Sequence, residues 1–445
     1  MRARSLFALL GTVATTGLVL LCGSGPAAAQ PYHILVPGRF AQPPTTADCE
    51  TQLGIACYAP FQFQQAYDMN PLYRAGLDGA GKTIVIVDSF GSPTIEADLK
   101  TFDEAFGLPA PPSLSIIQPA GPVPPFDPGN STMAGWAEET SLDVEYAHSM
   151  APGANILLVE TPVAETEGVT GFPEIVEAEN YVIRHNLGDV ISQSFGATEE
   201  TFPNQASLRS LRGAYKNAFV HHVTVLGSSG DGGATDYELN GTDLFRRQVN
   251  SWPSSDPLVT SVGGTQLHLD ANGFRTAPDN VWNDNPLVAT PPAASGGGVS
   301  SVFRRPFYQN GVASIVGGAR GTPDISMSAA VDGAAIVYLG FPGITPGYYP
   351  IGGTSEASPL FSGIVAIADQ AAGHRLGLLN PALYALGNGG TGGIVDITTG
   401  TNTVTFPQGG QTITVNGFDA VPGYDLSSGL GTANGNRLVN DLTGG

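Results

Sequence analysis

The chain has 445 residues, with 39 acidic against 18 basic side chains and a formal net charge of −21. This balance, with only three lysines and no basic run, argues against nucleic acid and anionic membrane surfaces as partners, because both need clustered Lys and Arg. The apolar fraction of 42% suffices for a large core, excludes a mainly disordered chain, and at this length allows several domains or one large α/β domain.

The N-terminus has the order of a secretory signal peptide. Two arginines precede an apolar stretch over residues 6–22, and Ala-Ala-Ala at 27–29 then forms a small-residue cleavage site before Gln30. We therefore expect residues 1–29 to be removed and the mature protein to be secreted to the extracellular space, without a membrane attachment. The alternative is an uncleaved membrane anchor, because the apolar stretch is nearly long enough to span a bilayer.

Residues 30–60 are rich in turn residues and show no clear periodicity, so we expect a short N-terminal segment there. Cys49 and Cys57 are the two cysteines that remain after signal removal. In an oxidising compartment we expect them to form one short disulfide that ties down this segment. Two unrelated free thiols are the alternative interpretation.

From residue 83 onward, short apolar runs alternate with segments of helical periodicity. The runs typical of buried strands are 83–88, 154–160, 189–195, 223–227 and 258–262, and the helical segments are 95–106, 173–187 and 208–220. This alternation predicts an α/β fold with a doubly wound parallel sheet, whose active site lies at the carboxyl ends of the strands. No change in composition marks a second domain.

Ser355 is the candidate nucleophile. It follows Gly-Gly-Thr and precedes a long apolar helix to Ala371, so it would stand at a helix N-terminus, where free amides and the helix dipole favour a developing anion. Pro359 is expected in the first turn of that helix, the place where proline fits. The alternative is that Ser355 is a simple N-cap. A lipase-type nucleophile elbow is excluded, because no glycine stands two residues after the serine.

The residues expected to activate this serine are acidic. Glu139 and Asp143 are four residues apart, so on a helix both carboxylates lie on one face, where their repulsion raises a carboxylate pKa. A solvated acidic helix face is the alternative. His148 lies five residues beyond Asp143, cannot share that face, and is interpreted as a packing or surface histidine. The His-Gly-Thr-His-Val-Ala motif of a histidine-based subtilisin is absent.

A further acid follows the apolar run 223–227. Asp231 stands in the motif Ser-Ser-Gly-Asp-Gly-Gly, at the predicted carboxyl end of a strand, where such sheets place their ligands. The alternative is an Asx-turn, since Asp-Gly is a common turn pair.

These motifs in combination closely resemble the sedolisin family of serine-carboxyl peptidases: Glu-x-x-x-Asp, Ser-Gly-Asp after a strand, and Gly-Gly-Thr-Ser-x-x-x-Pro. Residues 262–265, 295–300 and 322–325 match that family too, in family order. The resemblance implies a subtilisin-like fold with a single large peptidase domain over residues 61–445. Members usually carry a large N-terminal prodomain, so either folding here needs no such chaperone or residues 30–60 serve as a reduced one.

The resemblance also assigns roles to individual residues. It implies Ser355 as the nucleophile, Glu139 as the general base, Asp143 as the partner that orients Glu139, and Asp231 as the oxyanion donor. Asp88 ends the first predicted strand, where a subtilisin keeps its triad aspartate. The resemblance gives Asp88 no such role, and we interpret it as structural.

Two motifs near the C-terminus, Asp-Ile-Thr and Val-Pro-Gly-Tyr-Asp, resemble the calcium site of the family. The resemblance implies carboxylate ligands from Asp396 and Asp425 and backbone carbonyl ligands from Ile397, Val421 and Gly423. Calcium takes hard oxygens of this kind, and we expect one structural ion. The alternative is two turns that contain acids.

The sequence thus predicts a secreted, monomeric serine-type endopeptidase that hydrolyses peptide bonds of proteins at acidic pH. One alternative is a secreted, non-catalytic binding protein on the same scaffold, and another is a histidine-dependent subtilisin-type protease. The pH range follows from the residue types, because the base must be ionised whereas an aspartic acid donates a hydrogen bond only while protonated. We expect an optimum roughly between pH 3 and 5.

Overall fold

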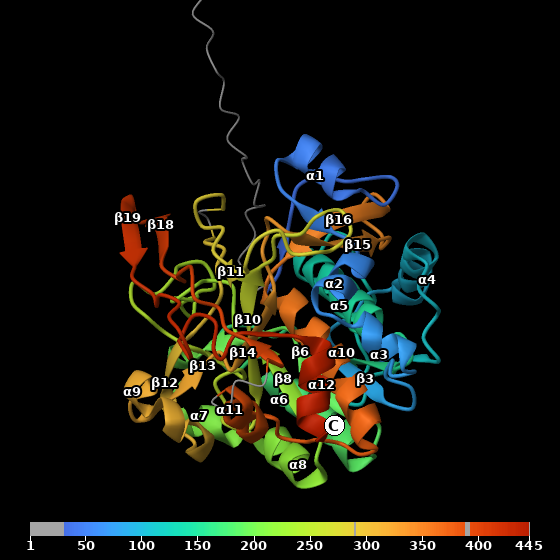
Figure 1. Cartoon of the computed structure of the whole chain (residues 1–445). Helices are drawn as coiled ribbons and strands as arrows, with labels where there is room; N and C mark the ends of the chain where they lie inside the picture. The colour runs from blue at the N-terminus through green and yellow to red at the C-terminus, as the bar shows by residue number, and fades with distance from the viewer. Residues whose placement is uncertain (1–30, 289–290, 388–391, 445) are drawn as a thin grey trace, which may run out of the picture.

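The computed structural model describes residues 31–288, 291–387 and 392–444, and the expected signal peptide lies outside this part of the chain. A large sheet runs through the middle of the molecule, and helices cover both of its faces (Figure 1). The α/β fold with a doubly wound parallel sheet is therefore confirmed.

Eight strands of the main sheet run parallel to one another. In spatial order they are β4 (Leu114–Ile117), β5 (Asn155–Thr161), β3 (Thr83–Ser89), β6 (Val190–Gln193), β8 (Thr224–Ser228), β10 (Thr260–Gln266), β14 (Ile325–Ser328) and β20 (Thr432–Ala433). Two short strands pair antiparallel with this sheet, β17 (Ile394–Val395) with β20 and β11 (Asn280–Val281) with β10. The chain enters the sheet at β3 and winds outward from it in both directions, so β3 lies at the switch point.

Smaller sheets surround this core. The four-stranded sheet has the order β1 (Ile34–Leu35), β16 (Gly347–Gly352), β15 (Ala334–Leu339) and β2 (Cys57–Tyr58). Three strand pairs complete the β-structure: β7 (Ala197–Thr198) with β9 (Ser251–Trp252), β12 (Gly298–Arg304) with β13 (Ala319–Thr322), and β18 (Val404–Gln408) with β19 (Gln411–Val415).

Twelve α-helices occur in the described residues, and several of them cover the two faces of the main sheet. They are α1 (Thr46–Leu53), α2 (Pro60–Ala66), α3 (Asn70–Arg74), α4 (Ile95–Phe106), α5 (Ser131–Met150), α6 (Phe172–Arg184), α7 (Gln205–Ser210), α8 (Gly213–His221), α9 (Ala313–Val316), α10 (Thr354–Ala372), α11 (Asn380–Gly387) and α12 (Gly435–Thr443). α5 and α10 pack on one face, and α6 and α8 pack on the other.

The strand β3 shows why both faces need a helical layer. Ile84 and Ile86 pack into the apolar cluster under α5 and α10, whereas Val85 and Val87 pack into the cluster under α6 and α8. Successive side chains of a strand point to opposite faces, so an uninterrupted apolar run needs apolar neighbours on both sides.

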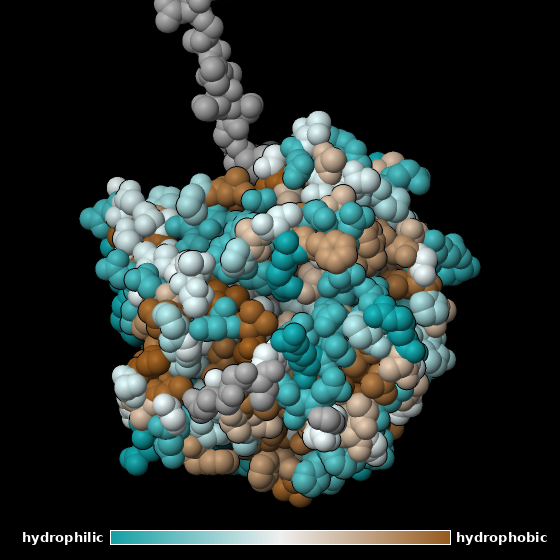
Figure 2. All heavy atoms as spheres, in the orientation of Figure 1, coloured by the Kyte–Doolittle hydropathy of each residue, from teal (hydrophilic) through white to brown (hydrophobic). Residues whose placement is uncertain are grey.

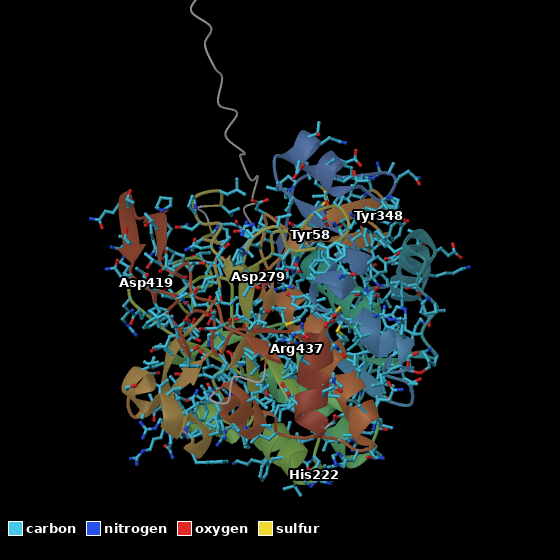
Figure 3. The ribbon with its side chains drawn as sticks, viewed as in Figure 1. Tyr58, His222, Asp279, Tyr348, Asp419 and Arg437 are labelled. Atoms are coloured by element: carbon cyan, nitrogen blue, oxygen red, sulfur yellow. A yellow bond between two sulfur atoms is a disulfide. The ribbon has the colours of Figure 1, made fainter. Side chains whose placement is uncertain are left out.

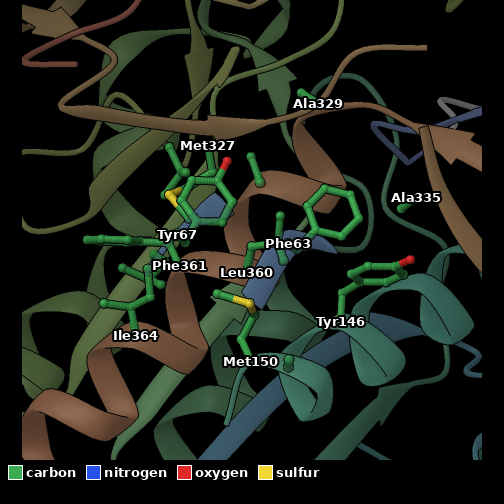
Figure 4. Packing of buried hydrophobic residues seen from close by; sticks show 14 of the residues in the cluster. Phe63, Tyr67, Tyr146, Met150, Met327, Ala329, Ala335, Leu360, Phe361 and Ile364 are labelled. Carbon is green, nitrogen blue, oxygen red and sulfur yellow. The ribbon is translucent and has the colours of Figure 1, made fainter. Parts of the chain in front are cut away.

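Facing residues of α2, α5 and α10 form the centre of the larger cluster. Figure 4 shows Phe63 of α2 and Tyr146 of α5 beside Leu360 of α10. The rings of Phe63 and Tyr146 lie edge to face with centroids 5.4 Å apart, and all three side chains are fully buried. Because such cores are close-packed, this cluster fixes α5 relative to α10, the two helices that carry the predicted acid pair and the predicted nucleophile.

The N-terminal segment is more regular than expected. Residues 46–53 form α1, although the sequence of this segment shows no clear periodicity. Thr45 and Asp48 form a reciprocal capping box at its start, a local signal that outweighs the weak apolar pattern. The predicted disulfide between Cys49 and Cys57 is present, with Cα atoms 5.9 Å apart.

The helix expected over residues 208–220 was also wrong in extent, because it is two helices. α7 ends at Ser210 and α8 begins at Gly213, a residue with low intrinsic helix propensity. The remaining predicted strands and helices of the sheet region are observed with end shifts of a few residues.

Labelled side chains in Figure 3 mark two opposite ends of the molecule. His222, which follows α8 and precedes β8, lies at the opposite end of the molecule from Tyr58 and Tyr348 of the four-stranded sheet (Figure 3).

Hydrophilic side chains predominate on the face seen in Figure 2, where apolar side chains form separate patches. Among the described residues, no helix combines the length and apolarity needed to cross a bilayer.

Candidate active site

Ser355 is the second residue of α10, directly after β16 and the turn at Gly353. Its side chain is fully buried, and its Oγ donates a hydrogen bond to the carbonyl oxygen of Ser194 at 3.3 Å. Its backbone N–H donates to the carbonyl oxygen of Tyr32 at 3.1 Å. Gly353 holds the N-cap position, so the interpretation of Ser355 as a simple cap was wrong. Ser355 instead donates its own backbone N–H, one of the free amides at the start of the helix, to the carbonyl oxygen of Tyr32.

Gly353 is required at this turn. Its φ of +132° is one that side chains of L-residues rarely adopt. A Cβ at this position would lie 2.4 Å from the carbonyl oxygen of Tyr32 and 2.6 Å from Asp231 Oδ2. The absence of a side chain therefore lets both oxygens approach the backbone that leads into α10.

Pro359 is not in the first turn of the helix, and that expectation was wrong. α10 begins at Thr354, which makes Pro359 its sixth residue. Because proline has no N–H, the carbonyl oxygen of Ser355 loses its usual partner one turn later. Ser194 Oγ lies 3.4 Å from that oxygen, but its one proton has a closer acceptor in Asp143 Oδ1 at 2.8 Å.

Glu139 and Asp143 lie on one face of α5 and are both fully buried, which excludes the alternative of a solvated acidic face. Asp143 Oδ1 accepts a hydrogen bond from Ser194 Oγ at 2.8 Å, and Glu139 Oε2 contacts His33 Nδ1 at 2.6 Å. Ser194 thus connects two predicted site residues, because its hydroxyl contacts Asp143 and its carbonyl accepts from Ser355.

Asp88, at the end of β3, completes a buried carboxyl cluster with Glu139 and Asp143. Burial raises the pKa of Asp143 well above its usual value, and the charges of Glu139 and Asp88 raise it further. Burial and the charge of Glu139 act in the same direction on the pKa of Asp88. Within the described part of the chain, Glu139 Oε1 and Asp143 Oδ2 receive no N–H or O–H donor. The two carboxyl groups are within hydrogen-bond reach, so one proton held between them satisfies both.

Asp231 follows β8 and lies beside the start of α10. Its Oδ1 accepts hydrogen bonds from the backbone N–H of Thr354 at 2.8 Å and from Thr354 Oγ1 at 2.7 Å. Its Oδ2 is buried and has no partner among the described residues. Burial raises the pKa of Asp231 well above its usual value. The two hydrogen bonds from Thr354 lower this pKa, and the charge of Glu139 raises it. A proton on Oδ2 would therefore be retained into a higher pH range.

Two residues at this site, Tyr32 and His33, were not predicted. The imidazole of His33 contacts Glu138 Oε2 through Nε2 at 3.1 Å, in addition to its contact with Glu139. Burial by itself would lower the pKa of His33, but the hydrogen bonds to Glu138 and Glu139 outweigh it and raise the pKa to about 10. No motif marks these two residues, because only tertiary contacts bring the N-terminal segment to Ser355.

Ser194 was also missed, although a signal was available. It lies just beyond β6, at the carboxyl end of a predicted strand, the same criterion that identified Asp231. His148 is a packing histidine: it is fully buried, and its Nε2 lies 2.8 Å from the carbonyl oxygen of Pro109.

The residues predicted to bind calcium come together at one place. The backbone N–H of Gly423 donates to Asp396 Oδ2 at 2.8 Å, and that of Val421 donates to Asp425 Oδ2 at 3.1 Å. Burial and the charge of Asp425 raise the pKa of Asp396, as expected for two neighbouring carboxylates. The backbone of Ile397 is adjacent in the chain. This set of oxygens fits a hard cation in donor type, while no group of three or more His, Cys, Asp or Glu side chains suited to a metal occurs in the described ranges.

The sequence of the chain matches one protein family and is similar to several known proteins. Residues 130–419 match the subtilase family. The chain is 32% identical to kumamolisin from Bacillus sp. (strain MN-32) over 394 residues, which cover 86% of this chain and 63% of that protein. It is 28% identical to sedolisin from Pseudomonas sp. (strain 101) over 374 residues, which cover 84% of this chain and 59% of that protein.

A solved structure is similar over most of the chain. Pseudomonas sedolisin, a serine-carboxyl proteinase complexed with two molecules of pseudo-iodotyrostatin, superposes with a TM-score of 0.72 at 27% identity and covers 88% of this chain and 99% of the solved chain. Against the full-length relatives, this chain spans about three fifths of their length.

Proposed function

Because this chain belongs to the subtilase family, and within it to the sedolisin group of serine-carboxyl peptidases, we propose that it hydrolyses peptide bonds of proteins with Ser355 as nucleophile. One observation carries the proposal: a peptide carbonyl, that of Tyr32, lies against the backbone amide of Ser355 and beside Asp231. Acyl transfer needs a carbonyl oxygen in such a place, since negative charge develops there in the transition state.

The other site residues have roles consistent with their contacts. Ser355 Oγ attacks the carbonyl carbon of the substrate and passes its proton to Glu139. Asp143 orients Glu139 through the carboxyl–carboxyl contact and is itself held by Ser194. The developing oxyanion accepts hydrogen bonds from the N–H of Ser355 and from protonated Asp231, whose Oδ2 is otherwise without a partner in the described residues.

An acidic working range follows from these roles. Glu139 must be ionised to accept a proton, whereas Asp231 must be protonated to donate one. The raised pKa of Asp231 keeps its proton available into a higher pH range. Activity therefore falls as the pH rises through the pKa of Asp231. It also falls in stronger acid, where a carboxylate base is protonated, which gives a bell-shaped profile.

The contacts of His33 disfavour a histidine-dependent mechanism. Both ring nitrogens face carboxylates, those of Glu138 and Glu139, so neither is left to accept the proton of Ser355. A His33→Ala variant should therefore keep peptide hydrolysis. A histidine-based protease would instead lose it, and its activity would rise with pH through about 6.5.

The decisive experiment compares the wild-type protein with Ser355→Ala on a mixed peptide library at pH 4. A peptidase should lose at least about 10³-fold in rate, whereas the binding-protein alternative predicts no cleavage by either form and unchanged peptide binding. Mapping the cut positions also gives the side-chain preference of the site.

We further propose a secreted, monomeric protein with one structural calcium ion held by the carboxylates of Asp396 and Asp425 and by carbonyls of Ile397, Val421 and Gly423. When bound, the ion would neutralise two carboxylates and tie the loop that carries Asp396 to the loop before β20. Ligand linkage predicts a stabilisation of about 2.7 kcal/mol when calcium exceeds its Kd 100-fold.

The calcium proposal is tested by adding a strong chelator and following the melting temperature. Asp425→Ala should lower it and abolish the response to chelator, whereas the exposed neighbour Asp419, changed to Ala, should leave both unchanged. An unchanged melting curve with chelator, together with no bound metal in the purified protein, would exclude the site.

A further inference from the structure

A cavity of about 170 Å³ opens at the carboxyl ends of β3, β4 and β5, and its lining includes none of the residues described around Ser355. Phe90 directly follows β3, Gln118 directly follows β4, and Glu160 lies near the end of β5. Met133, in the first turn of α5, closes another side. Parallel sheets place ligands at this edge, and a cavity of such a volume holds one ring-sized group.

Glu160 is the acid of this cavity. It is buried, its Oε2 accepts a hydrogen bond from Gln118 Nε2 at 2.7 Å, and its Oε1 lies so close to Gly91 that a Cβ there would collide with it. Among the ion pairs that Lys and Arg form in the described ranges, none involves Glu160. The cavity wall therefore holds a buried carboxyl group without a cation.

A second polar group of the lining has no partner. Ser92 is 3% exposed, and its Oγ makes no hydrogen bond within the part of the chain that the structure describes. Buried hydroxyl groups are normally hydrogen-bonded, so this exception points to a ligand that completes the site. The carboxylate and the hydroxyl oxygen both accept hydrogen bonds, which an ammonium or guanidinium group donates.

The rest of the lining is apolar. Phe90 and Phe126 line the cavity together with Met133, a valine and two prolines. The φ of Phe90 is +62°, which is rare for a bulky residue, and its N–H donates to the carbonyl oxygen of Thr161 at 2.9 Å. Aromatic faces attract cations, and the methylene groups of Arg and Lys pack on apolar surfaces. An acid among aromatic side chains therefore fits a basic side chain.

The cavity lies beside the carboxyl groups of the proposed site. In the register of β3 and β5, Glu160 is the neighbour of Asp88. Ile86 and Leu158, two residues earlier on these strands, pack into the cluster under α5, so Asp88 and Glu160 point to the same face of the sheet. Neighbouring strands are about 4.8 Å apart, and the charge of Glu160 raises the pKa of Asp88. A peptide held at Ser355 therefore passes close enough for one of its side chains to reach the cavity.

We propose that this cavity binds one arginine or lysine side chain of the peptide substrate and that Glu160 selects it. The inference rests on the proposed function and adds a substrate class, namely peptides with a basic residue at one fixed position near the cut. The cationic group pairs with Glu160 and donates to Ser92 Oγ, and its methylene groups pack against Phe90 and Phe126.

The test uses peptides in which arginine is exchanged for citrulline, a neutral side chain of nearly the same shape, at each of four positions on either side of the cut. We expect arginine at one position to raise kcat/KM of the wild-type protein at least about tenfold over citrulline. Glu160→Gln should bring this ratio close to one. Glu96→Gln, which changes an exposed acid on α4, is the matched control and should keep the wild-type ratio.

A second variant covers the case in which Glu160→Gln does not fold. Val123 lines the cavity from a half-buried position, so Val123→Trp obstructs the cavity without entering the core. It should lower the ratio of arginine to citrulline at the same position.

Binding without hydrolysis gives an independent readout. Ser355→Ala, titrated calorimetrically with the same two peptides, should bind the arginine peptide at least about tenfold more tightly. This preference should increase from pH 4 to pH 6, because the ionised form of Glu160 pairs with a cation and burial raises the pKa of this acid. Of the side chains that face Glu160, Gln118 and Met133 do not titrate and Asp88 does. Ser355→Ala combined with Glu160→Gln separates the two acids, since it should show no such increase.

The outcomes distinguish this proposal from the proposed function. Wild-type protein that cleaves arginine and citrulline peptides equally at every position refutes the role of the cavity and leaves the proposed function intact. A preference that Glu160→Gln leaves unchanged also overturns the proposal, because another group then selects the side chain. Binding of the arginine peptide that depends on Glu160, in a protein that cleaves no peptide at any pH from 3 to 8, refutes the proposed function but not the cavity.

Discussion

Two buried groups of ionisable side chains in this molecule differ in the charged partners that lie beside their carboxyl groups. Behind Ser355, the carboxyl groups of Asp88, Glu139 and Asp143 pack together, and their cationic neighbour in the described residues is His33, which contacts Glu139, rather than a Lys or Arg. Arg320 of β13 and Asp324, which directly precedes β14, form a fully buried bidentate ion pair. Arg320 Nη1 donates to Asp324 Oδ1 at 2.7 Å, and Nη2 donates to Oδ2 at 2.5 Å.

The difference shows how the same residue type serves structure or chemistry. A carboxylate held by a guanidinium stays ionised, since the arginine remains charged at every working pH. Asp88 and Asp143 are buried without an ion pair of their own, and burial raises the pKa of each, so their charge depends on pH. Three variants test this contrast, in order of decreasing expected effect.

The largest effect is expected from removing the cation of the paired group. Arg320→Met leaves Asp324 buried and without its partner, which should lower the free energy of unfolding by about 3–5 kcal/mol at pH 7. Urea unfolding measures this loss. Arg320→Met combined with Asp324→Asn should recover much of it, because no unpaired buried charge remains. Equal stabilities of the single variant and the wild-type protein would show that the pair is not needed.

A buried acid without a cation should behave in the opposite way. Glu179 of α6 is fully buried and hydrogen-bonded to Gln193, and burial raises its pKa from 4.5 to about 8. Because the folded pKa lies above the unfolded value, the folded state binds the extra proton. The resulting stability is fully present below about pH 4.5 and is lost as the pH rises through about 8.

Glu179→Gln should therefore raise the free energy of unfolding at pH 7, by on the order of 3 kcal/mol, and change it little at pH 4. The exposed Glu177, changed to Gln on the same helix, is the matched control and should have no effect at either pH. Thermal unfolding at the two pH values gives both results. A loss of stability at pH 7 would contradict the assignment of Glu179 as a neutral acid.

The smallest effect concerns the oxyanion donor. Asp231→Asn keeps a neutral donor at every pH, so the alkaline limb of the activity profile should move upward by at least about one pH unit. The peak rate should fall by on the order of tenfold, since the amide replaces the acid in the same position. A pH–rate profile of peptide hydrolysis measures both quantities. An unmoved alkaline limb would assign that limb to another group.

Much of this architecture could be predicted from local sequence. The apolar run at β3 needs cover on both faces, which indicates a parallel sheet with two helical layers, and the spacing of Glu139 and Asp143 on one helix face follows from helical geometry. The Gly-Gly-Thr-Ser motif indicates the turn before α10, although Pro359 misplaced the start of that helix by several residues. Such features depend on neighbours within one or two turns of chain.

The identity of the groups that surround Ser355 was decided only by tertiary structure. Tyr32 and His33 contact residues more than 100 positions away, and no periodicity records a pairing over that distance. The environment of each carboxyl group could not be predicted either, because Asp231, Asp143 and Asp324 are the same residue type in the sequence. Only tertiary structure buries Asp231 and Asp143 and so raises their pKa values, and only tertiary structure places a guanidinium beside Asp324.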